Sequence, residues 1–139
     1  MFSRVLLLLA FFAIATPAAA ANVSIVIDLS DQHMRVSVGG APKSSFDVST
    51  GRKGYAPPKG TYGVQRMYTE YYSRKYDWAP MPYSIFFRGG YAIHGTYDTK
   101  RLGGVASHGC IRLSPENARR LYNLVLQHGS GNVSIRVKA

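Results

Sequence analysis

The residues whose chemistry stands out lie together in residues 107–112, which have the sequence Ser-His-Gly-Cys-Ile-Arg. Cys110 is the only cysteine, His108 stands two positions before it, and a second histidine, His94, lies upstream. A lone cysteine is more often a buried small hydrophobe. A thiol with an imidazole in reach, however, suits nucleophilic acyl transfer, because the thiolate attacks and the imidazole accepts and later returns the proton. We therefore take Cys110, His94 and His108 as candidate catalytic residues.

The same side chains allow a zinc site as an alternative. His94, His108 and Cys110 are all acceptable zinc ligands. The sequence shows no fourth ligand at a suitable spacing, and a metal would occupy the thiolate that the first interpretation needs. We therefore expect neither a metal nor another cofactor.

Residues 1–21 have the layout of a secretory signal peptide. A short basic start is followed by an apolar stretch over residues 5–16, which is short for a bilayer span, and then by small residues. We expect cleavage after Ala20 or Ala21, which leaves one domain over residues 22–139 and no stable membrane span. An uncleaved N-terminal anchor is the less favoured alternative. The expected location is the periplasm or the cell envelope.

Export bears on the thiol and on the charge. A single cysteine outside the cytoplasm cannot pair within its own chain, which favours a reactive role for Cys110. The formal net charge is +10. Because an exported protein rarely meets nucleic acid, we expect the positive charge to favour an anionic envelope surface, such as wall polymer or lipid head groups.

The chain after residue 21 is predicted to be mostly β. Short alternating or β-branched segments, separated by glycine and proline, suggest a sandwich or barrel. The expected strands are residues 23–28, 33–38, 43–49, 61–67, 84–87, 91–94 and 132–137. Residues 51–60 are predicted to be a loop, and the aromatic and charged residues 68–78 an insertion beside a cleft.

One helix is predicted directly after the cysteine motif. Ser114 is a good N-cap, Pro115 suits the first turn, and Gly129 can end the helix. Between them, apolar residues recur at helical spacing, so one face should pack on the core.

The motif in residues 107–112, preceded by His94, Gly95 and Thr96, resembles the signature of the L,D-transpeptidase catalytic domain, the YkuD-type family. Residues 48–51, 57–62, 81–83 and 87–94 also resemble segments of that family, so the resemblance covers most of the chain after residue 21. It implies a mostly β, YkuD-like sandwich with one helix in the C-terminal half, packed beside the catalytic motif.

The resemblance also implies a reaction. The substrate would be a peptidoglycan stem tetrapeptide, and the thiolate would attack the carbonyl of its third residue, expel the terminal D-alanine and leave a thioester. Cys110 matches the nucleophile, His94 the general base, and Gly95 the residue whose carbonyl orients that base. Ser107, His108 and Gly109 match the segment that lines the oxyanion site. Arg112, Tyr83 and Tyr91 are the expected substrate-binding residues.

Several functional alternatives share these residues. The acceptor of the acyl group could be a second stem peptide, a free D-amino acid or an envelope protein. Water as the acceptor would make the protein an L,D-carboxypeptidase or an amidase. In a third interpretation the chain is a non-catalytic wall-binding module, and Cys110 is inert.

Overall fold

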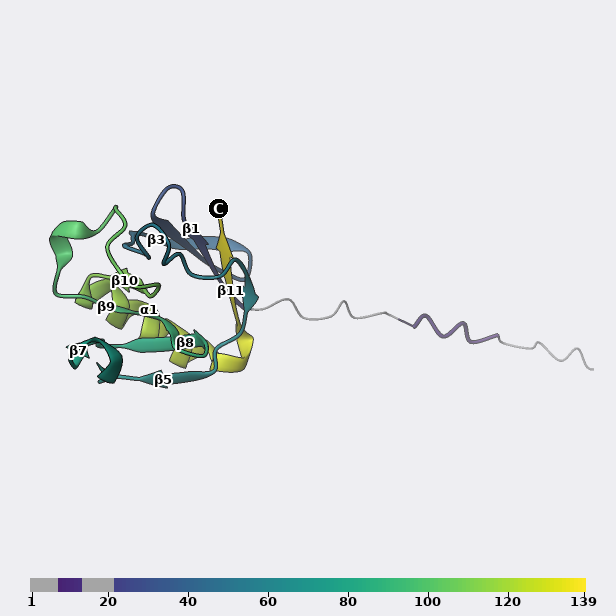
Figure 1. Ribbon diagram of the computed structural model, residues 1–139. Coiled ribbons are helices and arrows are strands. Elements are labelled where there is room, and N and C mark those ends of the chain that lie inside the picture. Colours follow the sequence, from purple (N-terminus) through teal and green to yellow (C-terminus); the bar gives the residue numbers. More distant parts are fainter. Residues whose placement is uncertain (1–7, 14–21) are drawn as a thin grey trace, which may run out of the picture.

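The computed structural model describes residues 8–13 and 22–139, and the predicted signal peptide therefore lies mostly outside the described residues. Within those two ranges, no helix is both long enough and apolar enough to cross a membrane. Residues 22–139 form a globular body of two main β-sheets and one α-helix, shown in Figure 1.

The first sheet is built largely from the two ends of this body. Its strands, in spatial order, are β3 (Ala41–Asp47), β2 (His33–Val38), β1 (Val23–Asp28), β11 (Val133–Lys138) and β4 (Gly60–Tyr62). β1 pairs antiparallel with β2 and parallel with β11. Alternate residues of β1 and β11 are buried, as their period-two pattern predicts.

The second sheet carries the cysteine motif. Its order is β10 (Ile111–Leu113), β9 (Tyr91–Gly95), β8 (Ser84–Arg88) and β5 (Arg66–Tyr68). A small hairpin lies beyond it, formed by β6 (Tyr72–Ser73) and β7 (Ala79–Pro80) with the 3₁₀ turn η1 (Arg74–Tyr76) between them. Two further 3₁₀ turns, η2 (Thr99–Arg101) and η3 (Ser130–Asn132), join other elements.

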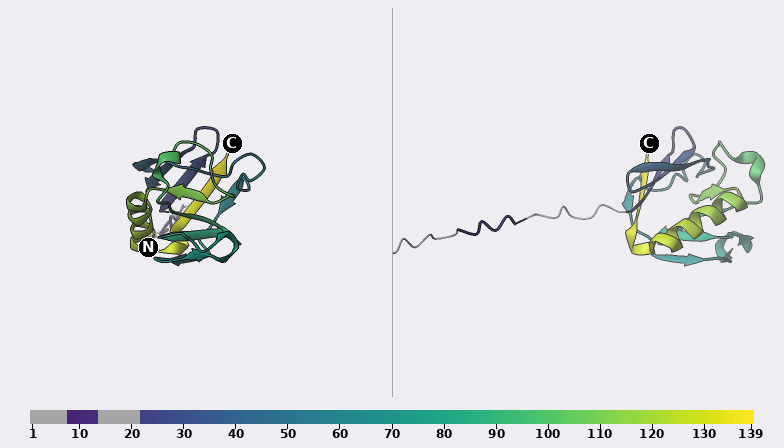
Figure 2. Two further views of the ribbon diagram at one scale, coloured as in Figure 1. Left: turned by 60° about the vertical axis from the view of Figure 1, so that its left-hand side comes forward. Right: turned by 180° about the vertical axis from the view of Figure 1, so that it is seen from behind.

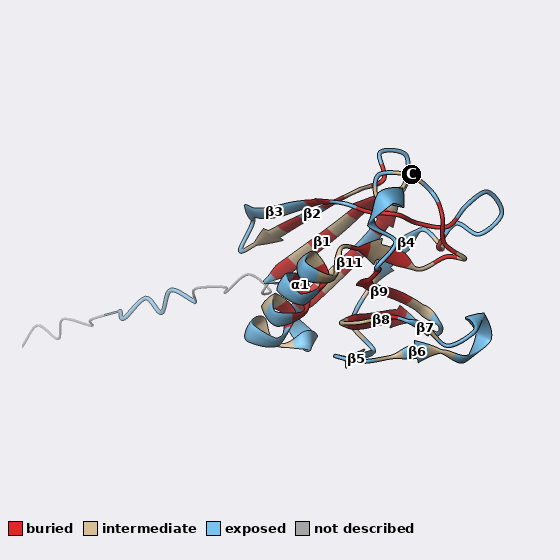
Figure 3. Cartoon of the chain, turned by 90° about the vertical axis from the view of Figure 1, so that its left-hand side faces the viewer, coloured by how far each residue is buried: buried red, intermediate tan, exposed pale blue. Residues whose placement is uncertain are grey.

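The helix α1 (Pro115–His128) packs on β8, β9 and β10, and it stands in front of them in the rear view of Figure 2. The Ser114 hydroxyl accepts a hydrogen bond from the Asn117 N–H at 3.2 Å, and Gly129 follows the last turn with φ 87°, so both predicted helix ends are confirmed. Burying the apolar face of α1 between the sheets gives the main core, and Met81, Phe86 and Ala92 form a second, smaller cluster next to Cys110; buried residues are red in Figure 3. The largest fully buried side chains of the main core include Phe87, Ile25, Ile27, Met34, Ile85, Ile93, Ile111, Leu113, Leu121 and Ile135.

Most predicted strands are confirmed within a residue or two, but the strand predicted over residues 61–67 is wrong. The chain there divides into β4, which pairs with β11 in the first sheet, and β5, which pairs with β8 in the second. The strand predicted over residues 43–49 lies two residues earlier, since β3 spans Ala41–Asp47. β10 was not predicted, because a three-residue strand leaves no measurable period.

Candidate active site

Cys110 lies directly before β10, where the second sheet borders a cavity of about 500 Å³. The thiol is half-buried and donates a long hydrogen bond to the Gly90 carbonyl oxygen, with Sγ and oxygen 3.7 Å apart. The cavity is also lined by His94, Ser107, His108, Arg112, Tyr91 and a group of residues between 71 and 86. The structure therefore brings both candidate histidines to the same cavity as the thiol.

His94 is held by the strand next to the cysteine. β9 runs parallel to β10, and His94 is 4% exposed. Its Nδ1 lies 2.6 Å from the Gly95 carbonyl oxygen. Because a carbonyl can only accept, the proton stays on Nδ1 and leaves the lone pair on Nε2. The pKa of His94 is lowered to about 4, mainly because the ring is buried. The hydrogen bond to Gly95 raises this pKa, and the charge of Arg112 lowers it to a smaller extent.

Gly95 leaves little room for a side chain in this arrangement. A Cβ there would lie 3.0 Å from Pro82 Cγ and 3.1 Å from the Cα of Pro115 at the start of α1. Its N–H donates to the Pro82 carbonyl at 2.8 Å. The residue that orients His94 is therefore itself fixed between a loop and the helix.

The thiol is neutral at rest in this environment. Burial raises the pKa of Cys110, while a backbone hydrogen bond from Ala92 and the charge of Arg112 lower it to a smaller extent. With His94 also neutral at pH 7, the resting pair is a thiol and an imidazole, not a thiolate and an imidazolium.

Ser107 ties the turn before the nucleophile into a fixed shape. Its hydroxyl donates to the Cys110 carbonyl at 2.7 Å and accepts the Gly109 N–H at 3.0 Å. Gly109 has φ 126°, and a Cβ on it would come within 2.7 Å of the Tyr91 ring. Only glycine fits here without moving Tyr91, a predicted substrate-binding residue that lines the cavity.

His108 has a different environment from His94. The Arg52 guanidinium donates to its Nε2 at 2.6 Å, which occupies the lone pair that a base would use. The ring stacks on Tyr76, with centroids 4.3 Å apart and planes 8° apart, and meets the Tyr55 ring edge-on. Burial and the charges of Arg52, Arg112 and Lys75 lower the pKa of His108.

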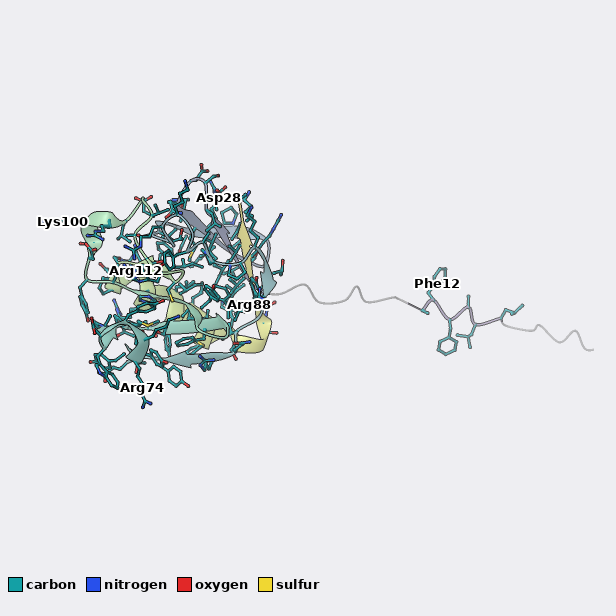
Figure 4. The ribbon with its side chains drawn as sticks, viewed as in Figure 1. Phe12, Asp28, Arg74, Arg88, Lys100 and Arg112 are labelled. Atoms are coloured by element: carbon teal, nitrogen blue, oxygen red, sulfur yellow. The ribbon has the colours of Figure 1, made fainter. Side chains whose placement is uncertain are left out.

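Arg112, labelled in Figure 4, also lines the cavity, and its strand β10 is at one edge of the second sheet. Its backbone exchanges two hydrogen bonds with Ser49, at 2.8 and 3.0 Å. Among the described residues, its buried Nε has no hydrogen-bond partner, and neither does the Ser49 hydroxyl. Burial lowers the pKa of Arg112. The unpaired Nε leaves the guanidinium with unused hydrogen-bonding capacity beside the thiol.

Gln32 supports the site from a distance and was not found by sequence reasoning. It is 6% exposed in the turn between β1 and β2, where its amide donates to Thr50 Oγ1 at 2.6 Å and accepts the Thr50 N–H at 2.9 Å. The Thr50 carbonyl in turn accepts the N–H groups of Ala106 and Ser107, both at 2.9 Å. A chain of hydrogen bonds thus joins the first sheet to the turn that holds Cys110. The sequence gives no sign that Gln32 is buried, and burial was the missing signal.

Tyr83 is the one predicted substrate-binding residue that does not line the cavity. Its ring packs edge-on against Tyr122 of α1, with centroids 5.6 Å apart. Tyr76, Arg74 and Lys75 also line the cavity, in agreement with the insertion beside a cleft that was predicted over residues 68–78. Within residues 8–13 and 22–139, no three side chains from His, Cys, Asp and Glu gather as a metal site.

The sequence over residues 22–135 matches the YkuD family, described as the L,D-transpeptidase catalytic domain. No curated protein has a significant sequence match to this chain.

Solved structures are similar in fold. An L,D-transpeptidase from Mycobacterium smegmatis is 26% identical with a TM-score of 0.75, and the match covers 86% of this chain and 59% of that one. One from Stackebrandtia nassauensis is 25% identical with a TM-score of 0.75, over 90% and 59% of the two chains. L,D-transpeptidase 3 from Mycobacterium tuberculosis, solved with a faropenem-derived adduct, is 21% identical with a TM-score of 0.75, over 85% and 60%. The chain thus spans about three fifths of the length of these relatives.

Proposed function

The chain belongs to the YkuD family of L,D-transpeptidase catalytic domains, and we propose that it is a cysteine-dependent L,D-transpeptidase acting on peptidoglycan stem tetrapeptides. One observation carries the proposal: the only thiol of the chain shares a cavity with a buried imidazole whose Nδ1 proton is committed to a backbone carbonyl. Such an imidazole has its Nε2 lone pair ready to accept a proton.

The proposed reaction passes through a thioester. The Cys110 sulfur attacks the carbonyl carbon of the third peptide residue while Nε2 of His94 takes the thiol proton. The bond to the terminal D-alanine then breaks, and its nitrogen leaves with that proton as a free amine. An amine acceptor attacks the thioester, loses a proton to His94 and restores the thiol. Each step balances, and no cofactor is required.

The proton must move as the carbon–sulfur bond forms. The pKa of His94 is lowered to about 4 and that of Cys110 is raised, so a preformed ion pair is disfavoured at neutral pH. His94 therefore acts as a general base during attack, and it returns the proton readily because its lowered pKa makes the imidazolium a strong acid.

Other residues of the site are assigned to binding and to charge stabilisation. We assign the turn of Ser107, His108 and Gly109 to the oxyanion that develops on the attacked carbonyl, and Arg112 to an anionic group of the donor peptide. A guanidinium can hold a carboxylate by two parallel hydrogen bonds. Tyr91 lines the cavity, and we assign it to contact with the donor peptide. Tyr83 packs on Tyr122, and we assign it to support of this side of the cavity.

We also propose that residues 1–21 direct export, so that the domain meets its substrate in the cell envelope. The acceptor is left to experiment: a second stem peptide, a free D-amino acid and an envelope protein each present a suitable amine. Hydrolysis by water is the competing outcome.

Mass spectrometry of wall fragments tests the proposal. The purified protein is incubated with disaccharide tetrapeptide, with and without a free D-amino acid. Dimers linked through the third residue, or products exchanged at the fourth position, support a transpeptidase, whereas trimmed tripeptides alone would assign a carboxypeptidase. Cys110→Ala is the matched inactive control. If the wild-type protein also gives no product, the chain would be assigned as a non-catalytic wall-binding module.

A further inference from the structure

The hairpin of β6, η1 and β7 carries aromatic side chains on its solvent-exposed surface. Trp78 is 61% exposed, Tyr72 is 52% exposed, and the neighbouring Tyr68 is 41% exposed. Figure 3 shows the hairpin as largely exposed beside the buried strands β8 and β9. Large aromatic side chains gathered at the surface mark interaction sites more often than isolated ones do.

The same hairpin forms a wall of the catalytic cavity. Its residues Ser73, Arg74, Lys75, Tyr76, Ala79 and Pro80 line the cavity. Tyr71, just before the hairpin, lines it too and stacks on the exposed Tyr68, with centroids 5.5 Å apart and planes 28° apart. A ligand that extends out of the cavity across this wall would therefore pass directly onto aromatic rings.

The backbone at the exposed Trp78 has an unusual conformation. Asp77 and Trp78 have φ of 52° and 57°, a left-handed conformation that residues other than glycine rarely adopt. The Trp78 N–H donates to the Ser73 carbonyl at 2.8 Å, which closes the hairpin. The Arg74 guanidinium lies 5.6 Å from the centre of the Trp78 ring, and Figure 4 shows Arg74 at the molecular edge. Strained backbone of this kind persists where the surroundings enforce it, and it concentrates at ligand sites.

We propose that this aromatic hairpin binds the glycan strand of the wall polymer by stacking sugar rings on Trp78 and Tyr72. The apolar C–H face of a pyranose ring fits an aromatic face, and Arg74 and Lys75 supply donors for its hydroxyl and acetamido oxygens. Since stem peptides are attached to the glycan, a peptide in the cavity would bring its own strand to the cavity wall. The assignment of the glycan rests on the proposed function, while the stacking surface does not depend on catalysis.

Trp78 gives a direct test, because it is the only tryptophan of the chain and intrinsic fluorescence reports on its ring alone. The Cys110→Ala protein is titrated with the hexamer of β-1,4-linked N-acetylglucosamine, and we expect a saturable change of emission. Tyr72→Ala should weaken the affinity about tenfold, the upper end of what one aromatic contact provides. Leu126→Ala, a 58% exposed apolar residue of α1 away from the cavity, is the matched control and should bind as the parent does.

A kinetic comparison separates this inference from the proposed function. The ratio of kcat/KM for a glycan-linked donor to kcat/KM for the free tetrapeptide should exceed one in the wild type and fall toward one in Trp78→Ala. If the protein acylates the free peptide but its emission does not respond to the hexamer, the glycan surface is overturned and the proposed function stands. If the hexamer binds and no donor reacts, the glycan surface stands and the proposed function is overturned. A response to phosphatidylglycerol vesicles without one to the hexamer would instead assign the hairpin to a membrane surface and overturn the proposal.

Discussion

Nδ1 of His94 lies 2.6 Å from the carbonyl oxygen of Gly95, its own neighbour in the chain. A histidine would not normally reach the next residue's carbonyl in a straight strand, and the contact forms where β9 ends and Gly95 fits against Pro82 and Pro115. It fixes the tautomer of His94 without an acidic partner. In His108, by contrast, the Nε2 lone pair already accepts a hydrogen bond from Arg52 and is not available to take a proton.

We predict that the two histidines differ in their pH profiles. In His94→Ala, acylation should fall about 10²–10⁴-fold at neutral pH and recover as pH rises and the thiol ionises by itself. In His108→Ala, the defect should persist at high pH, because His108 shapes the site and does not accept the proton. Stopped-flow acylation between pH 6 and 10 measures both. Recovery at high pH in His108→Ala, without recovery in His94→Ala, would mean that His108 is the base.

We predict that His94 makes the folded protein sensitive to acid. Its folded pKa of about 4 lies below the ordinary histidine value of 6.5, so the unfolded chain binds the proton more readily between these pH values. The contribution of neutral His94 to the free energy of unfolding is fully present above about pH 6.5. It declines as pH falls toward 4 and is lost below that, a change on the order of 3 kcal/mol. Urea unfolding at several pH values should show a shallower decline in His94→Ala. An identical slope in both proteins would contradict the buried neutral histidine.

We predict that Cys110 forms one covalent adduct with carbapenem-type β-lactams. The strained ring offers an acyl carbonyl to the same thiol and base that act on the peptide, and ring opening retains the leaving nitrogen within the adduct. Intact-mass measurement should show a single addition in the wild type and none in Cys110→Ala. An unmodified wild-type protein under prolonged exposure would argue against a reactive thiol.

We predict that Arg112→Lys raises the donor KM at least about tenfold with little loss of thermal stability. Lysine keeps the charge but cannot reproduce paired hydrogen bonds to a carboxylate. Arg101→Lys, at a cation exposed to solvent in a surface ion pair, is the control and should leave both values unchanged. A fall in melting temperature with an unchanged KM would make Arg112 a scaffold residue for the Ser49 pairing.

We predict that Gln32→Leu lowers kcat about tenfold or more, while donor KM changes little. The substitution removes the amide that holds Thr50, and Thr50 holds the turn before Cys110, so a small displacement of the nucleophile is expected. Thr50→Val, which removes one of these contacts, should have a smaller effect in the same direction. Gln127→Leu on the exposed surface of α1 is the matched control. A fall in melting temperature together with changes in both kcat and KM would indicate general damage to the fold.

Local sequence signals predicted the elements but not their partners. Ser114, Pro115 and Gly129 define the helix because capping depends on neighbouring residues alone. The division of residues 60–68 between two sheets could not be predicted in this way, since both halves have strand-forming residues and the choice of sheet depends on distant strands.

The site shows the same limit. Cys110, His94 and Gly95 could be identified because a motif encodes them, and the role of each stays a prediction. The distant support from Gln32 and the stack of Tyr76 on His108 depend on contacts between segments far apart in the chain. A pattern of apolar and polar residues does not show what an amide or a ring will reach.

The position of β11 has a consequence for how the protein is made. This strand follows every other described element in the chain, yet it lies inside the first sheet, between β1 and β4. A chain emerging in order from a ribosome or a translocation pore cannot complete that sheet until residues 133–138 arrive. Folding of this domain is therefore expected to wait for residues 133–138, and to be slow because its decisive pairing joins distant segments.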